Sequence, residues 1–287
     1  MQDYLKERIV LINSIKYITE VLEKSNAEYA FTKGAMLAIL DKNNFRHCDD
    51  VDVIVGKKDL KKLKKIMVFR GFSVLEINKN SFCAYDSQMN FDFHSGFEDA
   101  PNPFRFSDFE MSQCYRFKSY SLVRPELEFI HIAIHSGFHH GFYNEKIAIA
   151  DLEKIVICLN IDFKKLLDVS IMTRTLEFVF YFLNQLKVSK KIKSDFFVHM
   201  NKDRYDRILM IRKRLFKIKS SVKRSKLSQL YFNGFSNRAR IIIDSLFPAP
   251  GRMQITINKN GKYDVFKLIF RYAARPFYLA ARIMKIR

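Results

Sequence analysis

The segment Asp50-Val51-Asp52-Val53-Ile54-Val55 carries two acidic residues at the beginning of a β-branched run. β-Branched residues favour extended backbone, so this run predicts a strand over residues 51–55. Side chains alternate along a strand, which places Asp50 and Asp52 on one face, about 6–7 Å apart along it. Two carboxylates at that spacing can share hard cations.

A third acidic residue lies in a second predicted strand, Asn90-Phe91-Asp92-Phe93-His94. If this strand neighbours the first, Asp50, Asp52 and Asp92 converge on one patch. Close like charges oppose one another's ionisation, so such a patch favours bound cations. Mg²⁺, or Mn²⁺ in its place, fits these oxygen ligands, and two ions about 3.5–4 Å apart can support an in-line displacement. His94 would share the face of Asp92 and is expected to orient an acceptor.

A nucleotide-binding segment is predicted upstream, where a short strand, 29–32, runs into Lys33-Gly34-Ala35 and a helix through residue 40. Glycine lets the backbone approach a phosphate closely, and a helix N-terminus offers unpaired N–H groups with a favourable dipole. Arg46 can add a bidentate phosphate contact, because its planar fork matches phosphate oxygens. The predicted phosphate-binding residues and metal ligands therefore lie close together in the sequence.

The order of elements predicts an α+β fold with a mixed sheet covered by helices, followed by a helical C-terminal region. Ahead of residue 124 the expected helices are 4–25, 35–40 and 59–70, and the expected strands are 29–32, 51–55, 72–77, 81–86 and 89–94. Beyond it, helices are expected at 125–139, 146–159, 162–187, 203–218, 222–232, 236–246 and 263–284. We expect a catalytic domain over 1–123 and a basic, mainly helical domain over 124–287.

The net charge of +20 belongs to the C-terminal half. Residues 1–160 hold 21 Lys and Arg against 22 Asp and Glu, whereas residues 161–287 hold 29 against 8. Such a field favours an anionic partner: nucleic acid, an acidic lipid surface or a phosphorylated substrate. The basic amphipathic stretch 265–286 suits either peripheral contact with an anionic membrane or packing on its own domain.

Several other classes of protein are not indicated. The N-terminus does not read as a secretory signal, and no apolar stretch approaches the length of a membrane span, so we expect a cytoplasmic protein, at most peripheral to a membrane. Four widely separated cysteines suggest neither a zinc site nor a disulfide framework. His131 and His135 share one helix face and could form a zinc site with Asp151, but a structural hydrogen bond or an acceptor contact is the favoured interpretation. His139 and His140 are expected in a solvated loop.

The motifs together resemble a known family. The run Lys33-Gly34, Arg46 and Asp50-Val51-Asp52, followed by Phe91-Asp92-Phe93-His94, is similar to the uncharacterised-nucleotidyltransferase family, a branch of the DNA polymerase β-like nucleotidyltransferase superfamily. The likeness covers most of residues 28–160, including Pro125-Glu126, His131, His135 and Asp151-Leu152, and more loosely Phe247-Pro248 with Arg252. It implies the nucleotidyltransferase type of sheet, with Asp50 and Asp52 binding both metals and Asp92 completing the catalytic metal site.

The resemblance also assigns the outer phosphates to Gly34 and its helix. The wider superfamily prefers Gly-Ser or Gly-Gly there, so Gly34-Ala35 lacks a serine hydroxyl contact, which we interpret as a variation within this branch. The implied activity is metal-dependent transfer of an NMP group from a nucleoside triphosphate, such as ATP, to an unidentified acceptor, with release of pyrophosphate. A polyanionic acceptor such as RNA or an envelope glycan precursor would suit the basic half. The alternative is a basic nucleic-acid- or anionic-membrane-binding protein with a vestigial transferase lobe.

Overall fold

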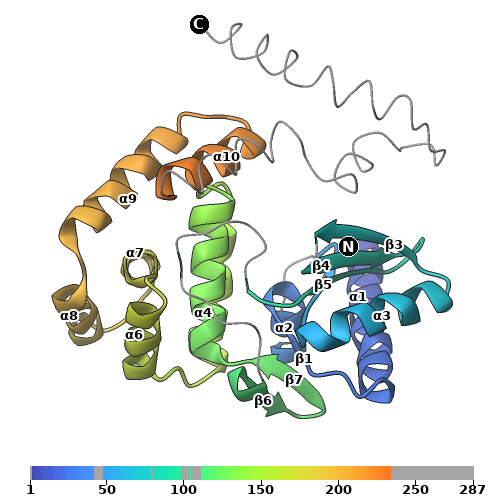
Figure 1. The fold of residues 1–287 in the computed structure, drawn as a ribbon. Coiled ribbons are helices and arrows are strands. Elements are labelled where there is room, and N and C mark those ends of the chain that lie inside the picture. Colours follow the sequence, from blue (N-terminus) through green and yellow to red (C-terminus); the bar gives the residue numbers. More distant parts are fainter. Residues whose placement is uncertain (1, 42–47, 79, 98–103, 105–110, 234–287) are drawn as a thin grey trace, which may run out of the picture.

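A seven-stranded mixed sheet organises the described part of the chain, which comprises residues 2–41, 48–78, 80–97, 104 and 111–233 of the computed structural model (Figure 1). The strands are β1 (Tyr29–Phe31), β2 (Val51–Val55), β3 (Ser73–Asn78), β4 (Ser81–Tyr85), β5 (Asn90–His94), β6 (Cys114–Phe117) and β7 (Tyr120–Val123). Their order is β3-β4-β5-β2-β1-β7-β6. β2 is parallel to β5 and β1 is parallel to β7, while the other neighbours are antiparallel. The two acid-bearing segments therefore lie side by side within the sheet.

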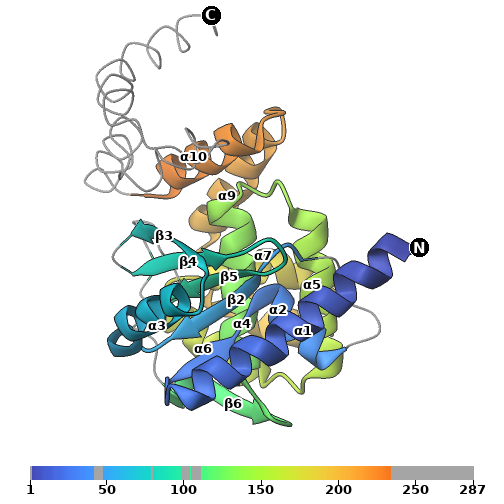
Figure 2. The same cartoon turned by 90° about the vertical axis from the view of Figure 1, so that its right-hand side faces the viewer.

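Helices α1 (Gln2–Lys24), α2 (Lys33–Leu40) and α3 (Lys57–Phe69) pack against this sheet (Figure 2). Apolar side chains that recur every three or four residues form the buried stripe of α1: Leu11, Ile15, Ile18 and Leu22. The ring of Tyr17 on α1 lies 6.2 Å from the ring of Phe91 on β5. The phenylalanine face of β5 is thus covered by α1, and Asp92 points to the other face because side chains alternate along the strand.

The other face of the sheet is covered by α4 (Pro125–Ile134), which continues into a π-helical turn over His135–His139. Leu127 on α4 packs with Ala30 of β1 and Ile54 of β2. Pro125 occupies the first turn of the helix, where its missing N–H costs nothing. Because Ile54 shares a face with Asp52, α4 lies on the side of the sheet to which the acidic residues point.

The remaining helices form a bundle around α4 (Figure 1). They are α5 (Glu145–Cys158), α6 (Phe163–Met172), α7 (Leu176–Gln185), α8 (Lys190–His199), α9 (Lys202–Leu215) and α10 (Ser221–Phe232). Their packing is tight where the π-helical turn meets α7: a Cβ added to Gly137 would lie 2.6 Å from the ring of Phe178. One hydrophobic core runs from α1 through the sheet to α9.

The predicted fold class is confirmed: a mixed sheet covered by helices precedes a helical region. The strands expected from the sequence all form within two residues of their predicted limits. The expected helix over 162–187 is wrong, because it is interrupted between α6 and α7. Arg174 has a φ of +60° there, and the hydroxyls of Thr173 and Thr175 bond to each other at 2.9 Å and to carbonyls of α6. The helices expected at 236–246 and 263–284 lie outside the described residues.

The sequence did not predict strands β6 and β7, helix α8 or the short 3-10 helix Met111–Gln113. The hairpin β6–β7 extends the sheet beside β1, and α8 follows α7. Within the described ranges, none of the helices combines the length and the apolar character that crossing a bilayer requires.

Arg212 on α9 joins the outer helices to α5 through Glu145. Its Nε and Nη2 atoms donate to the two carboxylate oxygens of buried Glu145 at 2.8 and 2.9 Å, and the Tyr181 hydroxyl donates to the same group at 2.7 Å. We expect Arg212→Met to lower the free energy of unfolding by about 2 kcal/mol, because a buried carboxylate loses its bidentate partner. Urea unfolding measures this, with the exposed Arg214→Met on the same helix as control. Equal stability of the two variants would contradict the prediction.

Candidate active site

Asp52 and Asp92 are paired across the parallel strands β2 and β5, where their Cα atoms are register partners. The flanking residues of both strands, Val51, Val53, Phe91 and Phe93, are fully buried in the core on the opposite face. The alternation of each strand therefore brings both carboxylates to the face covered by α4. Asp52 is itself buried, with 6% of its surface exposed.

His94 completes a cluster with these two carboxylates. It lies two residues after Asp92 on β5, and ligand atoms of Asp52, Asp92 and His94 all lie within 4.8 Å of one another. The Nε2 atom of His94 is 3.9 Å from Oδ1 of Asp52. The sequence placed His94 near an acceptor, whereas the structure places its ring among the groups that can hold an ion.

Asp92 also has a neighbour on the next strand. Cys83 of β4 is its register partner, and burial together with a hydrogen bond to Asp92 raises the pKa of this thiol. The thiol therefore stays protonated and acts as a donor to the carboxylate. The other oxygen, Oδ1 of Asp92, is buried and has no hydrogen-bond partner among the described residues. A buried carboxylate oxygen in this position suits a cation, so the donor set fits a divalent ion.

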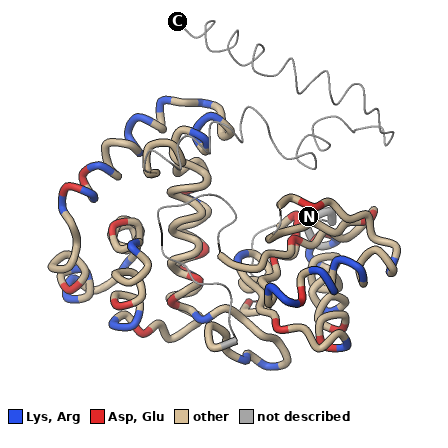
Figure 3. The backbone as a smooth tube through the Cα atoms, in the orientation of Figure 1, with Lys and Arg blue, Asp and Glu red and all other residues tan. Residues whose placement is uncertain are grey.

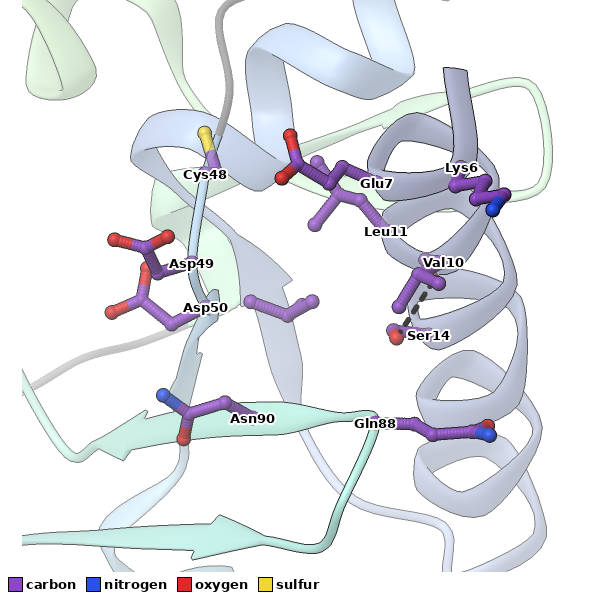
Figure 4. Close-up of a pocket in the computed structure, with 11 residues that line it drawn as sticks. Lys6, Glu7, Val10, Leu11, Ser14, Cys48, Asp49, Asp50, Gln88 and Asn90 are labelled. Atoms are coloured by element: carbon purple, nitrogen blue, oxygen red, sulfur yellow. Dashed lines mark hydrogen bonds between the residues drawn. The ribbon is translucent and has the colours of Figure 1, made fainter. Parts of the chain in front are cut away.

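Asp50 lies just before β2, in the bend that leads into the strand. It lines a cavity of about 280 Å³ between α1 and the beginning of β5, together with Asn90 and Gln88. Figure 4 shows its carboxylate pointing away from α1, whereas Gln88 reaches toward that helix. Burial, and then the charges of Asp52 and Asp92, raise the pKa of Asp50 to about 6. The third predicted carboxylate is thus electrostatically close to the other two, although it does not belong to the tight set with His94.

This pKa has a consequence for stability without metal. The folded protein holds the Asp50 proton more tightly than an unfolded chain does, so ionising Asp50 costs stability as the pH rises from about 4 through about 6. In EDTA, Asp50→Asn should match the wild type at pH 4 and become the more stable protein by pH 7. Thermal unfolding across this range measures the difference, with exposed Asp168→Asn as control. A difference that does not grow with pH would contradict the expectation.

Lys33 connects the beginning of α2 to the acidic pair. Its backbone has a φ of +49°, a left-handed conformation that is uncommon for lysine, and its Nζ donates to Oδ1 of Asp52 at 2.8 Å. Burial alone would lower the pKa of Lys33, but the charge and hydrogen bond of Asp52, together with the charges of Asp50 and Glu128, outweigh burial and raise that pKa. For Asp52, burial acts upward, whereas Lys33 and His94 together bring its pKa below the usual value. The two side chains therefore form a buried ion pair.

Glu128 on α4, which the sequence did not single out, binds the same junction. Its Oε1 accepts the backbone N–H of Lys33 at 2.6 Å, and its Oε2 accepts the hydroxyl of Thr32 at 2.5 Å. The Thr32 hydroxyl also contacts Nδ1 of His131 at 3.0 Å. Glu128 and Thr32 are both fully buried. The first N–H of α2 is thus taken by a carboxylate, and Gly34 and Ala35, both buried, follow it in the first turn.

The histidines of the second half lie along α4 and its π-helical turn. His131 contacts Thr32, and Nε2 of His135 lies 2.8 Å from Nε2 of His140. Burial, followed by the charge of Lys33, lowers the pKa of both His135 and His140. The expectation that His139 and His140 belong to a solvated loop is wrong: the π-helix includes His139, and His140 packs on His135. Arg46, the predicted phosphate contact, lies outside the described residues.

Comparison with known proteins shows the family of this sequence. A family described as uncharacterised nucleotidyltransferase matches residues 1–189, well over half of the chain. The chain belongs to this nucleotidyltransferase family. The match includes the sheet, the acidic pair, α4 and α7, but ends before the basic helices α9 and α10.

Solved structures similar to this nucleotidyltransferase include an antibiotic adenylyltransferase and an antibiotic-resistance factor. The lincosamide antibiotic adenylyltransferase LnuA, bound to lincomycin, is 14% identical with a TM-score of 0.40, and the match covers 50% of this chain and 95% of LnuA. ANT(2")-Ia in complex with adenylyl-2"-tobramycin is 14% identical with a TM-score of 0.42, covering 61% and 96%. A tRNA nucleotidyltransferase complexed with a primer tRNA and an ATP analogue is 12% identical with a TM-score of 0.25, covering 94% and 100%. Such distant likenesses do not specify a substrate. No curated protein matches the sequence significantly.

Proposed function

We propose that this protein transfers an NMP group from a nucleoside triphosphate to an acceptor hydroxyl or phosphate and releases pyrophosphate. The observation that carries the proposal is the pairing of Asp52 with Asp92 across parallel strands, beside the beginning of α2 and its Lys33. Membership of a nucleotidyltransferase family supports the reaction class.

The acidic residues would hold the metal. Asp50, Asp52 and Asp92 offer oxygen ligands for Mg²⁺ or Mn²⁺, and the unpartnered Oδ1 of Asp92 fits this role. A bound divalent ion supplies charge stabilisation at the phosphates and makes an acceptor hydroxyl easier to deprotonate. The acceptor oxygen attacks the α-phosphorus, the bond from that phosphorus to the bridging oxygen breaks, and pyrophosphate leaves.

The residues at the start of α2 would hold the triphosphate. Gly34 and Ala35 lie in the first helical turn, where backbone N–H groups and the helix dipole favour phosphate. The ammonium group of Lys33 now neutralises Asp52, and binding of a cation by Asp52 would free it to contact the outer phosphates. We keep Arg46 as a further proposed phosphate contact, and His131 and His135, with His94 nearest the metal, as candidates on the acceptor side.

The basic helices would present an anionic acceptor. Residues 190–232, from α8 to α10, carry 14 Lys and Arg against three Asp, and Figure 3 shows the basic residues following α9 and α10. This charge suits RNA or an envelope glycan precursor, with peripheral contact to an anionic membrane as a related role for the basic half. We accordingly propose a division of labour in which residues 1–123 form the catalytic domain and residues 124–287 the basic, helical domain that presents the acceptor.

The proposal is tested by following each phosphate separately. The pure protein is incubated with a cell extract, Mg²⁺ or Mn²⁺, and each nucleoside triphosphate labelled at either the α- or the γ-phosphorus. We expect label from the α-position in a larger product and label from the γ-position in pyrophosphate. Label from the γ-position in the product would instead indicate phosphoryl transfer and overturn the proposal. Salt-dependent RNA binding with no turnover would favour the alternative of a vestigial transferase lobe.

A further inference from the structure

His94 lies beside Asp52 and Asp92 and is the nitrogen donor of this cluster. It follows Asp92 by two residues on β5, so both side chains leave the strand on the face that carries Asp52. On the opposite face, Phe93 stacks on Phe82 of β4 with ring centroids 4.7 Å apart, which fixes β5 against β4. His94 is therefore held in place by a packed strand of the sheet.

The distances fit three ligands of one ion. A divalent ion bound at about 2.1 Å from each ligand cannot have two of its ligands more than about 4.2 Å apart. Nε2 of His94 lies 3.9 Å from Oδ1 of Asp52, and the ligand atoms of the whole cluster lie within 4.8 Å of one another. The upper limit of 4.8 Å exceeds the allowed separation by about 0.6 Å, a difference that rotation of the side chains can close.

The chemistry of the donor set then selects the ion. Mg²⁺ prefers carboxylate, carbonyl and water oxygens, whereas imidazole nitrogen suits transition ions, and Mn²⁺ accepts both kinds of donor while keeping octahedral geometry. We propose that His94 is a direct ligand of the ion held by Asp52 and Asp92, and that this nitrogen makes the site selective for Mn²⁺ over Mg²⁺. The inference rests on the proposed function only in assuming that Asp52 and Asp92 hold a divalent ion.

The ion pair between Lys33 and Asp52 weakens metal binding at Asp52, so the ion needs a further strong ligand. Oδ1 of Asp52 already accepts from the Lys33 ammonium at 2.8 Å, so an entering ion competes with a resident positive charge. A neutral nitrogen donor adds binding strength without a further negative charge beside Asp50, Asp52 and Asp92. It thereby avoids adding to the repulsion among these carboxylates.

Binding of Mn²⁺ to the protein alone, with no nucleotide, tests the inference. Electron paramagnetic resonance measures free Mn²⁺ in a titration, and its pulsed form detects nitrogen bonded directly to the bound ion. We expect a nitrogen coupling in the wild type that is absent in His94→Gln, together with about ten- to a hundredfold weaker Mn²⁺ binding and a nearly unchanged affinity for Mg²⁺, which therefore competes more effectively. His199→Gln, which changes an exposed histidine on α8, should behave as the wild type.

A second variant keeps the test decisive if His94→Gln folds poorly. His94→Glu supplies an oxygen ligand in place of nitrogen, so it should bind Mn²⁺ without nitrogen coupling and discriminate about tenfold less against Mg²⁺. Nitrogen coupling that persists in both His94 variants, or is absent from the wild type, would overturn the inference. Active transfer with Mg²⁺ and no nitrogen coupling would refute only this inference, whereas nitrogen coupling in a protein without transfer would refute only the proposed function.

Discussion

Asp92→Asn should reduce nucleotidyl transfer by about a thousandfold while the protein remains folded. Asparagine keeps the size of the side chain and can still accept the hydrogen bond from the Cys83 thiol, but it removes the negative charge next to Asp52. Loss of one charge-stabilising group at a reacting centre typically costs about 10²–10³ in rate, and loss of a metal ligand belongs at the upper end of that range. Initial rates with the α-labelled triphosphate measure the effect.

Stability separates loss of chemistry from loss of fold in this experiment. Removing one of several adjacent like charges should leave the metal-free protein at least as stable as the wild type. Asp168→Asn, an exposed position on α6, serves as control and should keep full activity. Transfer above about a tenth of the wild-type rate in Asp92→Asn would mean that Asp92 is not part of the catalytic machinery.

Glu128→Ala should be the most destabilising of the substitutions considered, with a loss of about 3 kcal/mol in the free energy of unfolding. The change leaves the N–H of Lys33 and the hydroxyl of Thr32 without their acceptor in a fully buried place, and it opens a cavity between α4 and β1. Urea unfolding measures the loss. Glu128→Gln, which can still accept one of the two hydrogen bonds, should lose about half as much.

Glu128→Gln should also impair catalysis, because Glu128 positions Lys33 and the start of α2. We expect Glu128→Gln to raise the KM for the triphosphate more than it lowers kcat, since the groups it orients would bind phosphates and do not react. Glu153→Ala on α5, which is exposed, is the matched control and should change neither quantity. An unchanged KM in a folded Glu128→Gln protein would assign Glu128 a purely structural role.

Periodic and local signals were sufficient to predict the central part of the fold. The β-branched run at 51–55 and the phenylalanine alternation at 90–94 each encode a strand and the face on which its acid lies. The register between the strands is a long-range property, so these local patterns favour a contact of Asp52 with Asp92 but do not determine it. The hairpin β6–β7 was not predicted from the sequence, because its turn lacks the glycine or asparagine that usually marks a hairpin. Lys118 occupies the turn instead, with a φ of +56°.

The missed residues share a different cause. In the sequence, Glu128 is one more charged residue in an apolar helix. Only the packing of α4 on the sheet shows that it accepts hydrogen bonds from the Thr32 hydroxyl and the Lys33 backbone N–H. A signal was present, because the neighbours Leu127 and Phe129 leave little room for a solvated carboxylate. The sequence predicts that His94 shares a strand face with Asp92. It does not predict the short distance from His94 to Asp52, because that distance depends on the register of β2 with β5.

The hydrogen bonds of Glu128 on α4 to the start of α2 limit where the protein can be truncated. A fragment ending at Val123 would keep every strand of the sheet yet lose the group that secures Lys33 and Thr32, and it would uncover the apolar surface around Ile54. Hybrids that exchange the helical half between relatives should therefore join the chains beyond His140, so that α4 and the sheet come from the same parent.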